Sequence, residues 1–555
     1  MARVQLVSGN SSAQSNDVRR LPSGLTNTTA GGLVSGMSSS YGHWRALYYT
    51  FSTHYAYKGK YTAMFTLRAD ATTKFGPKSR WGLFPAISGR WNVIDEKFME
   101  WPREHMQVSM FGLRLGWGRQ GNQPGSDFLY LNKYNSGSPY LDQIAMVSSG
   151  IKLTEFHWEN IFQWDGGVNL GFFDNRLEFV LDVYNRTTHD MLLPNYPIPS
   201  GTNGRTGLDV KNNGKMRNKG WEFSIIGHNL AKKGKFSMDV NVNFANNHNV
   251  ILEMDPIVLE GYNTDFSESN AQLLQRVQLN NPFGSIYGFR SKGVYMYNYD
   301  GTSKSAMRIV KTQGLAALQA SIDAGNTYPV ALDQNGRIIT NEKGEPLQMQ
   351  FCYKSESGSK YVFKGGDAIY EDVNNDGNIN QLDLVYLGNS LPKLTGGFGF
   401  RLHYDRFALN AQFNYRVDYD VFNMARLQME SMTTNDNQSQ AVNYRWRKEG
   451  DVTTIPRAMY GGGTNYNTLV SDRFVEDASF LRLNYLQLSY NFDPKLLKKW
   501  HLRSLRVNAN LDNLFCLTKY SGVDPEIGYG GYSVATDNSK TPRAKSYTFG
   551  LAIGF

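Results

Sequence analysis

Residues 236–244 of the 555-residue chain read Phe-Ser-Met-Asp-Val-Asn-Val-Asn-Phe. Every second side chain, from Phe236 to Phe244, is apolar, whereas the side chains between them carry hydroxyl, carboxylate or amide groups. Successive side chains of a β-strand point to opposite faces, so the alternation predicts a strand with one apolar and one polar face.

The same alternation recurs along the chain and each time persists for about 9–13 residues, the length that a tilted strand needs to cross a bilayer. Strands of soluble proteins usually run to about 5–6 residues. The segments lie near 44–57, 60–70, 81–94, 107–118, 155–171, 175–187, 217–230, 234–248, 393–405, 406–420, 474–492, 502–518 and 543–555. Their length and number favour an all-β fold, a transmembrane antiparallel β-barrel, over a soluble sheet with one wet face.

One of these segments changes its phase. Within 474–492, the apolar set moves from Leu481, Leu483 and Tyr485 to Leu486 and Leu488. One extra residue in a strand produces such a change, so we expect a β-bulge there.

Short and long connections alternate between the segments, as they do in barrels with short periplasmic turns and long outer loops. The long connections are 119–154, 188–216, 249–392, 421–473 and 519–542. The alternation holds if 95–106 is an inner turn, 71–80 is a short outer loop and the candidate strand 284–297 belongs to an outer loop. We expect a barrel portion over 44–555 with a long extracellular loop at 249–392, preceded by a Ser- and Gly-rich loop at 1–43.

The direction of the strands suggests that the barrel is incomplete. Counting back from a last strand that runs inward, the strand near 44–57 also runs inward, so the chain crosses outward before residue 1. Single-chain bacterial barrels have even numbers of strands, whereas about 13 are found here. We interpret the chain as the C-terminal portion of a larger barrel whose N-terminal plug and first strands are absent.

The end of the chain also has a barrel-like pattern. Phe549, Leu551, Ile553 and the terminal Phe555 alternate with small and hydroxyl residues. This resembles the C-terminal signal through which the barrel assembly machinery recognises outer-membrane proteins. The alternative is an ordinary last strand.

Composition excludes several other classes of protein. Aromatic residues make up 13% and charged residues only 19%, which excludes a disordered chain. The mean hydropathy is −0.46, and no run of about 18 apolar residues is present, so membrane-spanning helices are excluded. The two cysteines, Cys352 and Cys516, form no CxxC motif. Residues 1–10 lack the basic and apolar regions of a secretion signal.

Catalysis and nucleic-acid binding find little support. The nine histidines form no HExxH motif, and Ser357-Gly-Ser-Lys360 matches SxxK in a loop where Ser and Lys are common. The formal charge of +9 comes from dispersed Lys and Arg, which suit the anionic lipopolysaccharide leaflet better than a nucleic acid. We expect no enzymatic activity and no nucleic-acid partner.

One local motif indicates a structural calcium ion. Residues 372–383 place oxygen ligands at positions 1, 3 and 5, Gly at position 6 and a carboxylate at position 12, as in EF-hand-like loops. The candidate ligands are Asp372, Asn374, Asp376, Asn378 and Asp383. Position 12 is Asp instead of Glu, as in dockerin-like loops. The alternative is an Asx-rich turn that bonds its own backbone.

Substrate selection is expected on polar positions that face the lumen and on aromatic outer loops. Trp158, Trp164, Tyr196 and Tyr262 are weak candidates for stacking on sugar rings. Girdle or loop-packing roles are the alternative for these four side chains.

A series of short motifs resembles the SusC/RagA-type TonB-linked outer-membrane proteins of Bacteroidota. The motifs are Arg68-Ala-Asp-Ala-Thr-Thr-Lys-Phe-Gly76, Arg80-Trp-Gly-Leu-Phe-Pro85, Gly116-Trp-Gly-Arg-Gln-Gly-Asn-Gln123, Asn218-Lys-Gly-Trp-Glu222, Asp372-Val-Asn-Asn-Asp-Gly-Asn-Ile379, Leu387-Gly-Asn-Ser-Leu-Pro-Lys393 with Gly396-Gly397, Glu476-Asp-Ala-Ser-Phe-Leu-Arg-Leu483, and Asn513-Leu-Phe with Thr518-Lys-Tyr-Ser-Gly-Val-Asp-Pro-Glu526. Their order and spacing together are specific. Ser390, where the family usually has Pro, and Ala71-Thr72, in place of Gly-Ser, are departures.

The resemblance implies a barrel of about 22 strands with a plugged lumen, in the outer membrane of a Gram-negative, Bacteroidota-like bacterium. Such a protein imports oligosaccharides or peptides with a SusD-like surface lipoprotein. It draws energy from the TonB complex through N-terminal parts that have no counterpart here, so this fragment alone is expected not to transport. The alternatives are an outer-membrane adhesin or a passive porin without energy coupling, and, third, a soluble carbohydrate-binding sandwich.

Overall fold

The computed structural model describes residues 5–6, 10–14, 36–40, 43–136, 146–198, 207–263, 277–352, 360–461, 466–528 and 534–555. The chain divides into two compact units, the first with residues 1–175, 179–221 and 251–258, the second with 176–178, 222–250 and 259–555. In the described residues, no helix has both the length and the apolar character needed to cross a membrane.

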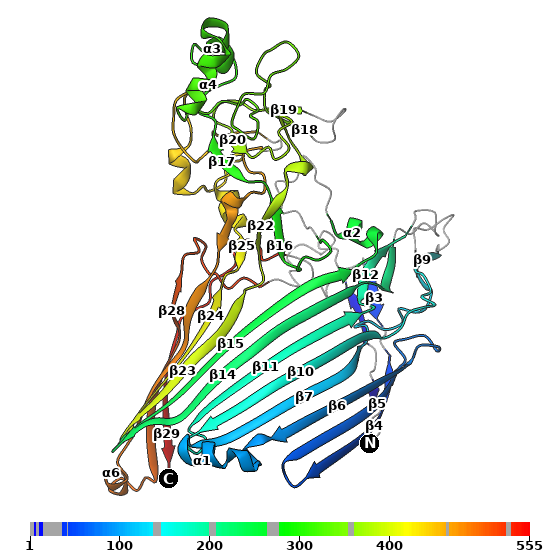
Figure 1. The fold of residues 1–555 in the computed structure, drawn as a ribbon, viewed down its shortest axis with the longest axis vertical. Helices are drawn as coiled ribbons and strands as arrows, with labels where there is room; N and C mark the ends of the chain where they lie inside the picture. The colour runs from blue at the N-terminus through cyan, green and yellow to red at the C-terminus, as the bar shows by residue number, and fades with distance from the viewer. Residues whose placement is uncertain are drawn as a thin grey trace, which may run out of the picture. The chain divides into compact units, whose positions relative to one another are not determined.

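Strands of one large sheet dominate both units (Figure 1). Their order is β1-β4-β5-β6-β7-β10-β11-β14-β15-β23-β24-β27-β28-β29, and every pairing with a described register is antiparallel. The strands are β1 (Gln5–Leu6), β4 (Arg45–Tyr57), β5 (Tyr61–Thr72), β6 (Trp81–Asn92), β7 (Val108–Asn122), β10 (Glu159–Phe172), β11 (Leu177–His189), β14 (Lys215–Lys233), β15 (Phe236–Glu253), β23 (Leu394–Tyr404), β24 (Phe407–Val417), β27 (Phe480–Asn491), β28 (Ser504–Thr518) and β29 (Ser546–Gly554). The thirteen strands predicted from alternation are therefore confirmed.

The strand registers place apolar side chains opposite apolar ones and polar side chains opposite polar ones. In the first unit Phe51 lies opposite Leu67, and Ser52 lies opposite Thr66. In the second unit the rings of Phe398 and Phe413 stack with their centroids 4.5 Å apart. Because one residue of slip would turn every side chain to the other face, the alternation also fixes the pairing.

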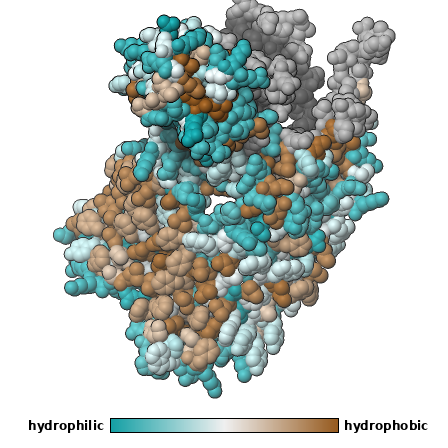
Figure 2. All heavy atoms as spheres, turned by 45° about the horizontal axis from the view of Figure 1, so that its top comes forward, coloured by the Kyte–Doolittle hydropathy of each residue, from teal (hydrophilic) through white to brown (hydrophobic). Residues whose placement is uncertain are grey.

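The apolar faces of these strands are exposed to the surroundings. Phe51 is 60% exposed and Leu551 is 64% exposed. Figure 2 shows brown, hydrophobic side chains gathered over the strands at the lower left of the view. Exposed apolar patches of this extent on regular strands indicate contact with lipid.

The predicted bulge lies at Asn484. Gln412 of β24 pairs with Tyr485, whereas Phe413 pairs with Leu483, so Asn484 is the extra residue. The pairing of β27 with β28 shifts at the same place. The segment 474–492 differs from expectation in another respect, because its first residues form a separate strand, β26 (Val475–Asp477), which pairs with β25 (Asp420–Phe422).

The connection 95–106 is a helical turn made of η3 (Val93–Asp95), η4 (Lys97–Met99) and α1 (Glu100–His105). Glu96 fastens it to the strands, because its carboxylate accepts from Tyr61 Oη at 2.6 Å and from Lys60 Nζ at 3.1 Å. The hydrogen bond from Tyr61 is the main cause that lowers the pKa of Glu96. A second turn contains α6 (Pro494–Lys498), which Asp493 caps.

The long connections contain short elements. In the first unit these are β8 (Lys133–Ser136), β9 (Met146–Gly150), β12 (Leu192–Pro197) and β13 (Gly207–Asn212), while α2 (Pro256–Tyr262) follows β15. Between α2 and β23 lie β16 (Ser285–Gly288), β17 (Ser291–Val294), α3 (Ala306–Gln313), α4 (Leu315–Asp323), β18 (Gln350–Cys352), β19 (Lys360–Val362), β20 (Ala368–Tyr370), β21 (Asn378–Ile379), η5 (Gln381–Asp383) and β22 (Val385–Asn389). Between β24 and β27 lie β25, α5 (Met424–Met429), η6 (Gln440–Tyr444), η7 (Asp472–Phe474) and β26. The candidate strand 284–297 thus belongs to a long connection, as expected.

The start of the chain departs from the expected loop at 1–43. Its described pieces are β1 and the antiparallel pair β2 (Asn10–Gln14) and β3 (Gly36–Ser40), and the other residues before 43 lie outside the described part. Ser- and Gly-rich composition indicated a loop, but strand pairing through the backbone does not require an apolar face.

Candidate functional site

The long connection between β15 and β23 has its own hydrophobic core. We call residues 277–352 and 360–393 the outer segment; in Figure 1 it lies beyond the ends of β23, β24 and β27 of the same unit. Phe289, Phe351, Phe363 and Tyr370 are buried in its core. Close packing of these rings holds the surface residues of the outer segment in defined positions.

A buried ion pair joins the outer segment to the connection that precedes β27. Arg457 Nε donates to Asp367 Oδ1 at 2.7 Å, and Asp367 is fully buried. Arg457 also donates to the hydroxyl of Tyr361 at 2.9 Å, and burial raises the pKa of that hydroxyl. The two long connections therefore form one packed body above the strands of the second unit.

An amide-rich cavity of about 520 Å³ lies beside β15, β22 and β25. Its polar lining consists of Asn246, Asn247, His248, Asn249, Asn281, Tyr386, Asn389, Lys393, Asp418 and Asp420. Lys393 Nζ pairs with Asp418 Oδ2 at 2.6 Å. Side-chain amides both donate and accept hydrogen bonds, so this cavity can bind hydroxyl groups or peptide groups.

Asp420 helps to shape this cavity. Its Oδ2 accepts the backbone N–H of Asn389 at 2.9 Å, and burial raises the pKa of its carboxyl group. A Cβ atom at position 388 would lie 2.2 Å from the same oxygen. Gly388 is therefore required in the Leu387–Lys393 motif, because its backbone passes so close to Asp420.

Ser390, one of the departures from the family motif, is fully buried and makes two hydrogen bonds. Its N–H donates to the carbonyl oxygen of Gly284 at 2.8 Å. Its Oγ accepts the N–H of Ala535 at 2.8 Å. A proline could make neither bond, so the serine joins segments that are distant in the sequence.

Two of the four aromatic candidates have no free ring face. Trp158 is 8% exposed, packs against Phe75 and Phe84, and donates from Nε1 to the carbonyl oxygen of Arg80. Tyr196 is 7% exposed. Its hydroxyl donates to Asp255 at 2.7 Å, and Lys211 Nζ lies 3.9 Å from its ring centroid. The packing of Trp158 and Tyr196 agrees with the loop-packing alternative, and sugar stacking by these two rings stays a prediction.

Trp164 does not line the amide-rich cavity. Trp164 lies opposite Trp117 in the β7–β10 pair, and the two are 46% and 45% exposed. They lie on the apolar face of the strands, which suits the girdle alternative. Tyr262 ends α2, and its side chain lies outside the described part of the chain.

The residues of the calcium motif are bonded mainly to their own backbone. Asp372 Oδ2 accepts the N–H of Gly377 at 2.7 Å, and Asp376 Oδ1 accepts the N–H of Asn378 at 2.7 Å. Asn374 Oδ1 accepts the N–H of Asp376 at 3.3 Å. The structure thus contains the Asx-rich turn that was the alternative interpretation.

The acidic groups of the loop lie close enough to influence one another. Burial raises the pKa of Asp383 to about 6, and the charges of Asp372 and Asp376 contribute to that rise. In the described part of the chain, no group of three or more His, Cys, Asp or Glu side chains is arranged to hold a metal ion. The calcium site stays a prediction.

The C-terminal residues proposed as an assembly signal lie in or directly after β29, the last strand of the sheet order. Phe549 is 78% and Phe555 is 81% exposed, and Leu551 and Ile553 share their face. These side chains are accessible to a binding partner or to lipid. Recognition by the assembly machinery stays a prediction.

Comparison with known proteins agrees with this architecture. The family model described as TonB dependent receptor-like, beta-barrel matches residues 6–514. TonB-dependent receptor P39 of Formosa agariphila is 29% identical over 516 residues, which cover 90% of this chain and 45% of the relative. TonB-dependent receptor SusC of Bacteroides thetaiotaomicron is 26% identical and covers 90% of this chain and 43% of the relative.

A solved structure shows the same fold. The structure of the RagAB peptide transporter superimposes with a TM-score of 0.72 at 20% identity, covering 96% of this chain and 50% of that chain. The antiparallel barrel fold expected from the sequence is thereby confirmed. The chain spans about half the length of the curated relatives it matches.

Proposed function

The chain belongs to the TonB dependent receptor-like β-barrel family, and we propose that it forms the barrel portion of a SusC/RagA-type nutrient importer in the outer membrane of a Gram-negative bacterium. The relatives come from Formosa agariphila and Bacteroides thetaiotaomicron, which supports a Bacteroidota-like source.

One observation carries this proposal. Strands such as β5 and β28 expose apolar side chains, among them Phe65 and Val507, and carry charges or amides on the other face, among them Arg68 and Asn508. On the polar side, Arg114 Nη2 pairs with Asp182 Oδ1 at 2.8 Å. This arrangement is unfavourable in water but suits a wall between lipid and an aqueous lumen.

The substrate class is an oligosaccharide or a peptide. The amide-rich cavity beside Asn389 and Asp420 can hydrogen-bond either class. We propose that a SusD-like surface lipoprotein covers the outer connections, including the outer segment. We further propose that the TonB complex supplies the energy for uptake.

The proposal is tested in the source bacterium. A strain that lacks the gene is grown on a panel of single oligosaccharides and peptides, and we expect loss of growth on one class. Tagged protein purified from outer membranes in detergent is expected to retain a surface lipoprotein, which mass spectrometry identifies. Normal growth on every nutrient, together with steady ion conductance in planar bilayers, would instead indicate the passive porin.

A further inference from the structure

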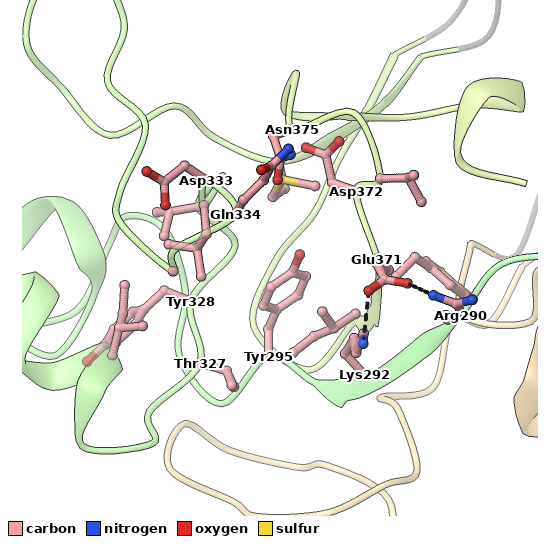
Figure 3. A pocket seen from close by; sticks show the side chains of 18 of the residues that line it. Arg290, Lys292, Tyr295, Thr327, Tyr328, Asp333, Gln334, Glu371, Asp372 and Asn375 are labelled. Atoms are coloured by element: carbon pink, nitrogen blue, oxygen red, sulfur yellow. Dashed lines mark hydrogen bonds and ion pairs between the residues drawn. The ribbon is translucent and has the colours of Figure 1, made fainter. Parts of the chain in front are cut away.

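A second cavity, of about 650 Å³, lies within the outer segment (Figure 3). Its walls come from β17 and β20, from residues 326–336 that follow α4, and from the start of the 372–383 loop. Cavities of about 300–1,000 Å³ are typical of small-molecule sites. The second cavity is separate from the amide-rich cavity, with which it shares no lining residue.

The hydroxyl of Tyr295 lies in this cavity without a partner. Tyr295 is 4% exposed, and its side chain points into the cavity in Figure 3. Among the residues that the structure describes, none hydrogen-bonds its hydroxyl. The neighbouring tyrosines differ, because Tyr328 bonds Ser321 Oγ at 2.9 Å and Tyr370 donates to the carbonyl oxygen of Tyr466 at 2.9 Å. The Tyr295 hydroxyl can both donate and accept a hydrogen bond, so it is available to a ligand atom in the cavity.

The basic groups in the walls are paired with an acidic group. Arg290 Nη1 and Lys292 Nζ each lie 3.0 Å from the Glu371 carboxylate (Figure 3). Asp333 and Asp372 accept backbone N–H groups of their own loops. An anionic ligand, such as the carboxyl terminus of a peptide, would have to displace Glu371 from Arg290 and Lys292.

The polar groups that remain available are uncharged. The side-chain amides of Gln334 and Asn375 make no hydrogen bond to any residue in the described ranges, and both line the same cavity as Tyr295 (Figure 3). Val330 and Met349 add apolar wall. Amides and phenols donate and accept, as sugar hydroxyls do, and apolar side chains match the C–H faces of a sugar ring.

We propose that this cavity binds a neutral sugar unit of an oligosaccharide, with the Tyr295 hydroxyl bonded to a sugar oxygen. The inference rests on the proposed import function and narrows its substrate class, because the outer segment would meet the nutrient outside the membrane.

The test uses the protein purified in detergent from its own outer membrane, with every segment that its gene encodes. Binding is measured on an array of neutral and acidic oligosaccharides, with mixed pentapeptides as competitors. Tyr295→Phe removes only the hydroxyl, and we expect it to weaken binding of the best neutral oligosaccharide about threefold to tenfold. Gln334→Ala is expected to act in the same direction. Tyr444→Phe is the matched control, since Tyr444 is 72% exposed and outside the cavity, and its affinity should be unchanged.

Several results would overturn the inference. Unchanged affinity in both Tyr295→Phe and Gln334→Ala would place sugar binding elsewhere, and binding of acidic sugars or peptides alone would refute the neutral class. Absence of any bound oligosaccharide would refute it too. These results leave the import function standing, since its failure appears separately as normal growth of the deletion strain. Equal thermal midpoints of the variants establish that folding is not the cause.

Discussion

Arg482 Nη2 donates to Asp524 Oδ1 at 2.5 Å, in an ion pair whose side chains are only 5% and 9% exposed. Arg482 lies in β27, whereas Asp524 lies in the connection between β28 and β29. Arg482 belongs to the motif at residues 476–483, and Asp524 belongs to the motif at residues 518–526. The fold brings these two motifs into contact through the ion pair. Arg543 adds to it by pairing with Glu526 Oε1 at 2.8 Å.

Breaking this contact should destabilise the barrel strongly. Arg482→Ala leaves the Asp524 carboxylate buried without its charge partner, and we expect a loss of about 3–5 kcal/mol in the free energy of unfolding. Urea unfolding in detergent, followed by tryptophan fluorescence, measures it. The control is Lys393→Ala, because Lys393 and its partner Asp418 are 75% and 57% exposed, and such pairs contribute at most about 1 kcal/mol. If both variants lost the same small amount of unfolding free energy, the view that burial makes the Arg482–Asp524 pair more important than the exposed pair would be contradicted.

The strands were predictable because their signal is local. Alternation alone gave every long strand and also the bulge at Asn484, since the faces of a strand are determined by neighbouring residues. The separation of β26 from β27 was not predictable, because Val475–Asp477 continues the alternation but pairs with β25.

The sites depend on distant contacts, and the sequence shows them only as isolated motifs. Tyr295 and Gln334 lie far apart in the sequence, and nothing near either residue indicates that both line one cavity. Trp158 and Tyr196 were candidates for sugar stacking because they are aromatic. Only the structure shows that Phe75 and Lys211 cover their rings.

Ser390 is expected to stabilise the outer connections through its hydroxyl. Ser390→Ala leaves the N–H of Ala535 buried without an acceptor, and an unsatisfied buried group costs about 1–3 kcal/mol. The urea midpoint should fall accordingly. Ser303→Ala, at an exposed position of the outer segment, is the matched control and should leave the midpoint unchanged. The role of the hydroxyl would be refuted by a Ser390→Ala midpoint equal to the control.

The raised pKa of Asp420 predicts a pH dependence. Burial is the main cause, although the N–H of Asn389 opposes it. A carboxyl group whose pKa is higher in the folded than in the unfolded chain binds protons more strongly when folded, so folding loses stability as pH rises between the two values. Asp420→Asn keeps an oxygen for the Asn389 N–H but carries no charge. Its stability relative to the natural protein should therefore increase from about pH 4 towards neutrality.

Asp451 provides a control of opposite sign. Backbone N–H groups of Arg447 and Lys448 lower the pKa of its carboxyl, so its contribution to stability is present above the unfolded pKa and lost as pH falls. Asp451→Asn should lose stability relative to the natural protein as pH rises. Urea midpoints taken along the same pH series test both variants. If the stabilities of Asp420→Asn and Asp451→Asn changed in the same direction with pH, the opposite pKa shifts of these two carboxyl groups would be contradicted.

Calcium binding at residues 372–383 is testable directly. Ca²⁺ prefers about 6–8 oxygen ligands, and we expect about 1 mM Ca²⁺ to raise the urea midpoint relative to the chelator EGTA. Asp383→Asn should abolish the gain, because it removes the carboxylate at position 12. Glu342→Gln, at an exposed position in the outer segment, should retain it. Identical midpoints in Ca²⁺ and EGTA would show that the loop is held by its own hydrogen bonds alone.

The two faces of β29 should respond differently to the same charge. Phe549 is 78% exposed on the apolar face, opposite Ala509, whereas Thr548 lies on the polar face opposite Asn510. Phe549→Lys puts an ammonium group into hydrocarbon and should cost up to about 2–4 kcal/mol, the most if the site is near the bilayer midplane. Thr548→Lys puts the same group into the aqueous lumen and should cost little. The readouts are the urea midpoint and the amount of folded protein in outer membranes, measured as a band that shifts on heating before electrophoresis. If Thr548→Lys were the more damaging variant, the apolar face of β29 would have to point inward, and the assignment of lipid and lumen along the whole strand would be reversed.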